Sequence, residues 1–97
     1  MLKNTRDIFL TTLSNKTRLS IIEVLMNGSK NVTQICKATG TNQTTISHNL
    51  TRLRRCGFVH MKKNGKERVY HLNEETIKPL IKLMNTHIEK YCKHYCD

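Results

Sequence analysis

Residues 42–59 read NQTTISHNLTRLRRCGFV, a run that combines a helix, a turn and the start of a strand. Asn42 is a typical N-cap and Gly57 a typical helix end. The apolar side chains between them that repeat at helical spacing are Ile46, Leu50 and Leu53. The opposite face carries short hydrogen-bonding side chains, three arginines follow, and no residue of the run is acidic. Such a surface favours binding to a polyanion over catalysis, because a catalytic site needs carboxylates or a nucleophile with its base.

Three further helices are predicted before this run. The segment NVTQICKATG predicts a short helix over about residues 32–39, and Gly40 ends it. Residues 5–13 and SNKTRLSIIEVLMNG (14–28) predict two more helices. A short helix, a tight glycine turn and a longer helix are typical of a helix-turn-helix.

The hydrophobic period changes after Gly57. In FVHMKKNGKERVYHL, the pair Asn64-Gly65 separates two strand-like runs, and Asn-Gly is the strongest short hairpin signal. A basic hairpin directly after a helix-turn-helix predicts a wing. The fold class is therefore mainly α with a β-hairpin: a winged helix-turn-helix with four helices, the wing and a long C-terminal dimerisation helix.

The C-terminal helix is expected to begin at Thr76 as N-cap, which places Pro79 in the tolerated first turn. Its apolar face is larger than so small a domain can cover, so we expect a second copy to cover it. The chain is then one DNA-binding domain over residues 1–97 that dimerises through residues 1–14 and 76–96. The predicted interface residues are Phe9, Leu13, Ile77, Leu80, Ile81, Met84, Ile88 and Tyr91.

Size and composition agree with a single small domain. The chain has 97 residues, of which 37% are hydrophobic, and no apolar run reaches the length of a membrane span. The N-terminus lacks the pattern of a signal peptide, so a cytoplasmic location is expected. Two of the four cysteines stand alone, which does not predict a secreted disulfide framework.

Positive charge is concentrated in the middle of the chain. The net charge is +10, and no acidic residue occurs between Glu23 and Glu67. Solubility alone is one explanation of this charge. Because the charge is so strongly segregated, a polyanionic partner is the better one: nucleic acid, or less often a membrane surface.

Three segments together resemble the ArsR/SmtB family of winged helix-turn-helix repressors: LSNKTRLSIIEVL, VTQICKATGTNQTTISHNLTRLRRCGFV and KNGKERVYHL. The resemblance covers nearly the whole chain. It implies a symmetric homodimer, joined through its first and last helices, that binds double-stranded operator DNA. It also implies release from DNA by a metal ion, a metalloid or a redox signal.

The resemblance places the family's base-contacting positions at Gln43, Thr44, Ser47 and His48. The side chains themselves suit this role, because Gln pairs with adenine, and Ser and Thr bond to bases or phosphates. The alternative is a solvated polar face. The residues expected to contact the DNA backbone are Thr45, Thr51, Arg52, Arg54, Arg55, Lys62, Lys63, Lys66 and Arg68. Arg54 or Arg55 could instead brace the fold against a carboxylate such as Glu23, and the hairpin could be a loose charged loop.

The metal sites of the family are not reproduced in this sequence. The family's cysteine ligands near the third helix fall at Asn31 and Thr33, whereas Cys36 and Cys56 fall where small buried residues belong. The family's zinc positions on the last helix read Glu74, Thr76, His87 and Lys90. Two of those four are not ligands, and a lysine puts positive charge where the cation should sit. No cofactor is therefore required.

Cys92 and Cys96 in YCKHYC are the remaining candidates for a sensor. Four residues apart, they share one helical face. They could bind a soft ion such as Cu(I), As(III) or Cd(II), or form a disulfide if the helix end frays, or be incidental.

The predicted function is a cytoplasmic, homodimeric, sequence-specific repressor and not an enzyme. The rivals are a winged-helix module that binds another protein and a protein that coats DNA without sequence preference.

Overall fold

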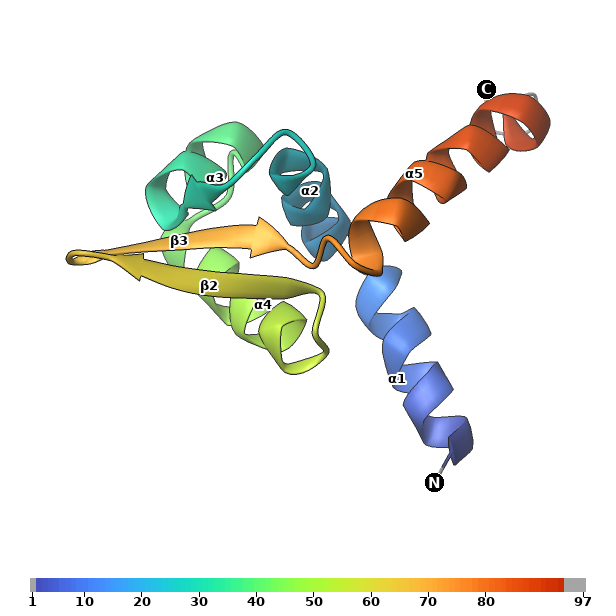
Figure 1. Cartoon of the computed structure of the whole chain (residues 1–97), viewed down its shortest axis with the longest axis horizontal. Helices are drawn as coiled ribbons and strands as arrows, with labels where there is room; N and C mark the ends of the chain where they lie inside the picture. Colours follow the sequence, from blue (N-terminus) through green and yellow to red (C-terminus); the bar gives the residue numbers. More distant parts are fainter. Residues whose placement is uncertain (1, 94–97) are drawn as a thin grey trace.

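The computed structural model describes residues 2–93 and shows a mainly helical winged helix-turn-helix fold, as predicted (Figure 1). The helices are α1 (Leu2–Leu13), α2 (Lys16–Leu25), α3 (Val32–Thr39), α4 (Gln43–Arg55) and α5 (Ile77–His87), and a π-helical turn (Ile88–Cys92) extends α5. The strands are β1 (Lys30–Asn31), β2 (Val59–Asn64) and β3 (Glu67–Leu72). They form one antiparallel sheet in the order β1-β3-β2. The β2–β3 hairpin projects from one end of the molecule, while α1 and α5 diverge at the other end (Figure 1).

Local capping signals set the helix boundaries around the helix-turn-helix. The side chain of Asn42 accepts a hydrogen bond from the backbone N–H of Thr45 at 2.8 Å, so α4 begins as predicted. Gly40 ends α3 with a φ of 69°, a left-handed conformation that glycine adopts without strain. Asn31 and Gln34 form a reciprocal capping box at the start of α3.

Helix α5 begins where predicted, with Thr76 at the N-cap position, but the cap is made differently. The side chain of Thr76 makes no capping hydrogen bond. Oδ1 of Asn73 instead accepts from the backbone N–H groups of Glu75 and Thr76, at 3.0 and 3.2 Å. A tight turn before the helix therefore satisfies these donors, and Pro79 still lies in the first turn of α5.

The core lies between the helix-turn-helix, the inner face of the sheet and the start of α5. The predicted stripe of α4 is buried, with Ile46 and Leu53 at 0% exposure and Leu50 at 1%. Two residues assigned to the dimer interface also belong here: Ile77 is 4% exposed and Ile81 is 1% exposed. That part of the interface prediction needs correction, because these side chains have almost no surface left for a second copy.

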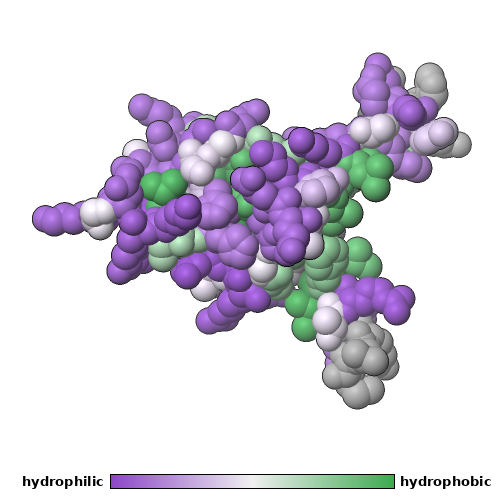
Figure 2. All heavy atoms as spheres, in the orientation of Figure 1, coloured by the Kyte–Doolittle hydropathy of each residue, from purple (hydrophilic) through white to green (hydrophobic). Residues whose placement is uncertain are grey.

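An apolar surface remains on α1 and α5, and Figure 2 shows it where the two helices diverge. The large apolar side chains exposed on the two helices are Ile8, Leu10, Leu83, Ile88 and Tyr91. Leu10 lines an apolar cavity of about 420 Å³ together with Leu13 of α1 and Met84 of α5. Ile8 lies on another side of α1, where it lines a separate cavity with Arg55 and Cys56. We call Leu10, Leu83, Ile88, Tyr91 and the first cavity the α1/α5 face. None of the helices in the described part of the chain is long and apolar enough to cross a membrane.

Candidate nucleic-acid interface

The four residues predicted to contact bases lie together on the exposed face of α4. They line a shallow hollow of about 450 Å³ with one further residue, Thr51. All five of these side chains are exposed, and the buried stripe occupies the opposite side of the helix. Oγ1 of Thr51 donates to the carbonyl of Ser47 at 3.1 Å, so its methyl group is oriented as well. The hollow therefore presents amide, hydroxyl and imidazole groups on one rigid helix, which suits hydrogen bonding to base edges.

Thr45 lies apart from this hollow. It is half-buried, and its backbone N–H and C=O bond to Asn42 and Asn49, respectively. Of the predicted backbone contacts, Thr45 and Arg52 are half-buried, and the others are exposed.

A second, cationic cavity adjoins the hollow. It has a volume of about 270 Å³ and is lined by Arg18, His48, Thr51, Arg52 and Arg55, so the two cavities share His48 and Thr51. We call this second space the arginine cavity. Arg52 is half-buried, and Arg54 and Arg55 are exposed. The proposed brace to Glu23 is not formed, since the one ion pair among the described side chains joins Lys93 and Glu89 at 3.2 Å.

Arg18 of α2 has a place in this interface that the sequence did not predict. Its Nε donates to the carbonyl of Thr12 at 2.9 Å, and Nη1 donates to Oδ1 of Asn49 at 3.2 Å. Nη2 donates to the carbonyl of Thr11 at 3.4 Å. Partial burial lowers the pKa of Arg18 from its ordinary value, and the nearby charge of Arg52 lowers it further. Arg18 therefore connects the end of α1 to the middle of α4 while keeping its charge beside the arginine cavity.

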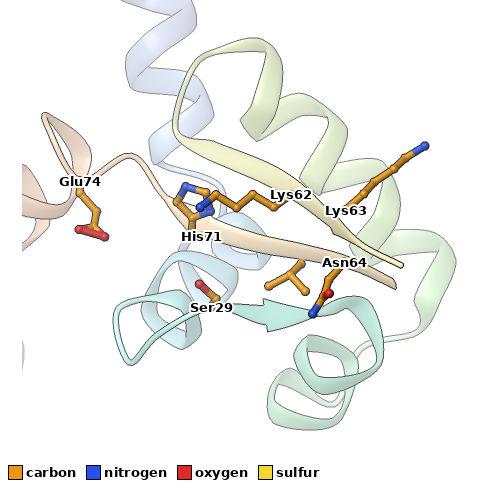
Figure 3. A pocket seen from close by; sticks show the side chains of 7 residues that line it. Ser29, Lys62, Lys63, Asn64, His71 and Glu74 are labelled. Carbon is orange, nitrogen blue, oxygen red and sulfur yellow. The ribbon is translucent and has the colours of Figure 1, made fainter. Parts of the chain in front are cut away.

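The cationic side chains of the wing point in different directions. Lys62, Lys63, Lys66 and Arg68 are all exposed, as a phosphate-binding wing requires. In Figure 3, Lys62 lies along the sheet toward His71, whereas Lys63 extends away from it. Neighbouring residues of a strand alternate in direction, so the two ammonium groups reach different places on the wing. Lys62 and Lys63 both line a cavity of about 430 Å³ that also includes Ser29, Asn64 and Glu74 (Figure 3).

Two of the zinc positions implied by the family, Glu74 and His87, lie on the surface of the chain. The His87 ring packs on Tyr91 with 5.0 Å between ring centroids. In residues 2–93, no group of three or more His, Cys, Asp or Glu side chains is arranged to hold a metal.

The cysteines separate into two groups. Cys36 and Cys56 are half-buried free thiols that pack against the core, and Sγ of Cys56 lies 3.5 Å from Oγ1 of Thr12. Cys92 is also a half-buried free thiol, at the end of the π-helical turn. Its proposed partner Cys96 lies outside the described residues, so the spacing of the two thiols stays a prediction.

Comparison with known proteins places this geometry in a family. Residues 15–61 match the model of the bacterial regulatory protein, arsR family. An uncharacterized HTH-type transcriptional regulator of Methanocaldococcus jannaschii is 37% identical over 70 residues, which are 71% of this chain and 79% of that one. The chain spans only 19% and 32% of two other, longer regulators, from M. jannaschii and Mycobacterium tuberculosis.

Solved structures agree with the sequence relatives. A homodimeric winged helix-turn-helix DNA-binding domain of Mycobacterium bovis, described as a possible ArsR-family regulator, has a TM-score of 0.87 and 30% identity over 96% of this chain and 86% of that one. The transcriptional repressor BigR of Xylella fastidiosa has a TM-score of 0.75 and 30% identity over 93% and 89% of the two chains. The fold, the sequence match and the exposed helix-turn-helix face agree, and the chain belongs to the arsR family of bacterial regulatory proteins.

Proposed function

We propose that this protein is a homodimeric, sequence-specific DNA-binding transcriptional regulator that acts as a repressor. The observation that carries the proposal is the exposed hollow of α4, which gathers Gln43, Thr44, Ser47 and His48 and continues into the arginine cavity. Short polar side chains that read bases thus lie directly beside cations that neutralise phosphate. The four residues act on base edges, and Arg52, Arg54, Arg55 and the wing cations act on the backbone.

The α1/α5 face supports a dimer. Leu83 and Tyr91 are 69% and 65% exposed, which is unusual for large apolar side chains that cluster on one side of a small domain. A second copy covers this face through a two-fold axis, with Leu80 and Met84 at the border of the core. The M. bovis domain is homodimeric, and it covers nearly all of this chain. A two-fold dimer places its recognition helices about 34 Å apart, one turn of B-DNA.

We propose repression rather than activation because the chain is similar in structure to the X. fastidiosa repressor. A dimer bound across an operator excludes other proteins from the same DNA. The site of action is the cytoplasm. The rival protein-interaction module needs an apolar or acidic recognition helix, and the exposed face of α4 is neither.

Release from DNA is proposed to act through Cys92 and Cys96, by oxidation or by binding of a soft metal ion. Cys92 lies on the extension of α5 close to Ile88 and Tyr91 of the α1/α5 face. A bond formed there changes how two copies meet, and a small rotation between subunits misplaces both recognition helices. The alternative is that the two terminal cysteines are incidental and that another ligand, or none, controls the protein.

The proposal is tested by binding of the purified dimer to the DNA upstream of its own gene and to random DNA of equal length, at several salt concentrations. A sequence-specific regulator prefers the upstream fragment by a factor of about 10³ or more. A protein that only coats DNA binds both fragments equally. A protein-interaction module binds neither.

A further inference from the structure

Three arginines surround one cavity without a carboxylate to balance them. Arg18 comes from α2, and Arg52 and Arg55 come from successive turns of α4. Within residues 2–93, none of the three has an acidic side chain within ion-pair distance. Guanidinium groups stay protonated at neutral pH, so their repulsion persists until an anion enters.

The geometry of Arg18 shows why it is held in this position. Its three hydrogen bonds go to two backbone carbonyls at the end of α1 and to the Asn49 side chain. All three acceptors are neutral, so the guanidinium is fixed in place and its charge is not cancelled. A guanidinium has about five N–H donors, and these bonds leave two of them for a ligand. The pKa of Arg18 is lowered for the same reason, since burial and the charge of Arg52 both disfavour the protonated guanidinium.

The position of the arginine cavity indicates which anion it binds. His48 and Thr51 line both this cavity and the hollow that faces base edges. An anion held here therefore lies next to the residues that face base edges, where a backbone phosphate of the bound DNA is the nearest anion. Arginine binds phosphate oxygens in pairs through its planar fork.

We propose that Arg18, Arg52 and Arg55 form a phosphate-binding site that clamps one backbone phosphate of the DNA at the side of the recognition helix. The inference rests on the proposed function and adds a residue to it, since Arg18 lies outside the helix-turn-helix. Because the same residue bonds to the last turn of α1, a phosphate in this site also fixes α1 relative to α4. Arg18 is then a positioning residue for the recognition helix as well as a phosphate ligand.

The test is the salt dependence of DNA affinity for single and double variants. Each phosphate neutralised contributes a slope of about −0.9 in log affinity against log salt. We expect Arg18→Gln and Arg52→Gln each to flatten this slope by up to about one unit per protomer. The double variant flattens it by no more than about one unit per protomer, because both side chains share one phosphate. Two separate phosphates would give about twice that change, which would overturn the shared clamp.

Two control variants distinguish a loss of phosphate binding from a loss of structural support. Asn49→Ala removes an acceptor of Arg18 but no charge, so it lowers stability and leaves the slope unchanged. Lys82→Gln removes one exposed charge from α5, away from the cavity, and also leaves the slope unchanged. If Arg18→Gln does not fold, Arg55→Gln reports on the same site, because the side chain of Arg55 also lines the arginine cavity and is exposed.

A second measurement locates the phosphate. Duplexes in which one linkage at a time is a neutral methylphosphonate should reveal one position per half-site where the replacement weakens DNA binding by the wild type but not by Arg52→Gln.

Inorganic phosphate is the other possible ligand with the same chemistry. If it raises the melting temperature where chloride of equal ionic strength does not, while DNA affinity ignores Arg52→Gln, the site belongs to a free anion and the proposal is overturned. If wild type binds DNA and the arginine variants keep its slope, the clamp is wrong and the proposed function stands; if wild type binds no DNA, both are wrong.

Discussion

The rings of Phe9 and Phe58 pack against each other with 5.0 Å between centroids and an angle of 36° between planes. Phe9 belongs to α1, and Phe58 lies between α4 and β2, so this contact attaches the first helix to the base of the wing. The pair joins the helix proposed to take part in dimerisation to the part of the chain proposed to read DNA. Its geometry is that of a tilted aromatic pair, which adds to the free energy of simple burial.

Phe58→Ala should lower the free energy of unfolding by about 3–5 kcal/mol, because Phe58 is fully buried and leaves a cavity. Phe9→Ala should cost about 1–2 kcal/mol, because Phe9 is only half-buried. Asp7→Ala, on an exposed position of α1, should change stability by less than about 0.5 kcal/mol. Denaturant unfolding measures all three. Equal values for Phe9→Ala and Asp7→Ala would mean that the ring contact does not hold α1.

Replacing the base-facing side chains should reduce specificity more than general affinity. Ser47→Ala and His48→Ala should each weaken operator binding about tenfold, since each removes one base contact and little charge. Binding to random DNA should change little. Fluorescence anisotropy with both duplexes at one salt concentration gives the comparison. Equal losses on both duplexes would assign these side chains to the backbone.

The wing lysines should act on operator and random DNA alike. Replacing Lys62, Lys63 and Lys66 together by Ala should weaken both and flatten the salt slope, because phosphate contacts carry no sequence information. Since Lys62 and Lys63 extend in different directions, the two single variants should differ in their effect on the slope. A triple variant with the wild-type slope would show that the wing does not lie on phosphate.

A charge on the α1/α5 face should separate the dimer. Leu83→Glu introduces a carboxylate on the most exposed large apolar side chain of the domain's described part, and its burial against a second copy is costly. Sedimentation should show monomers, and operator affinity should fall about 100-fold or more, because the half-sites are no longer engaged together. Lys82→Glu, next along α5 and also exposed, is the matched control and should remain dimeric. Dimers of Leu83→Glu would place the interface elsewhere.

The sensor proposal predicts a separation of binding from response. The double change of Cys92 and Cys96 to Ser should leave operator binding intact and abolish release by a thiol oxidant or soft metal. Cys36→Ala and Cys56→Ala should cost stability by leaving space in the core, and any response should persist. A double variant that responds like wild type, or a wild type that ignores oxidant and metals, contradicts the proposal.

Local signals in the sequence predicted the helix-turn-helix well. Asn42, Gly40 and the stripe of Ile46 and Leu50 act within one or two turns of chain, so their effect can be read without the tertiary structure. The gathering of the residues proposed to contact bases follows from the same periodicity. The family resemblance, now confirmed, carried the functional reading of that face.

Features that depend on distant partners were not predicted. Strand β1 consists of two residues whose pairing with Tyr70 and Val69 has no local signature. The apolar face of α5 was read as one interface, yet Ile77 and Ile81 are enclosed by other elements of the same chain. The sequence assigned no role to Arg18, because its contacts with Thr12 and Asn49 lie on other helices.

Asn31 connects the wing to the start of α3. It pairs with Val69 of the wing, caps α3 through its Oδ1, and donates from Nδ2 to Glu67 at 2.9 Å. Detaching the hairpin from the body therefore removes two contacts of the residue that caps α3, which couples the wing to the start of that helix. We expect the backbone amides of the wing and of α3 to exchange with deuterium through a shared opening event.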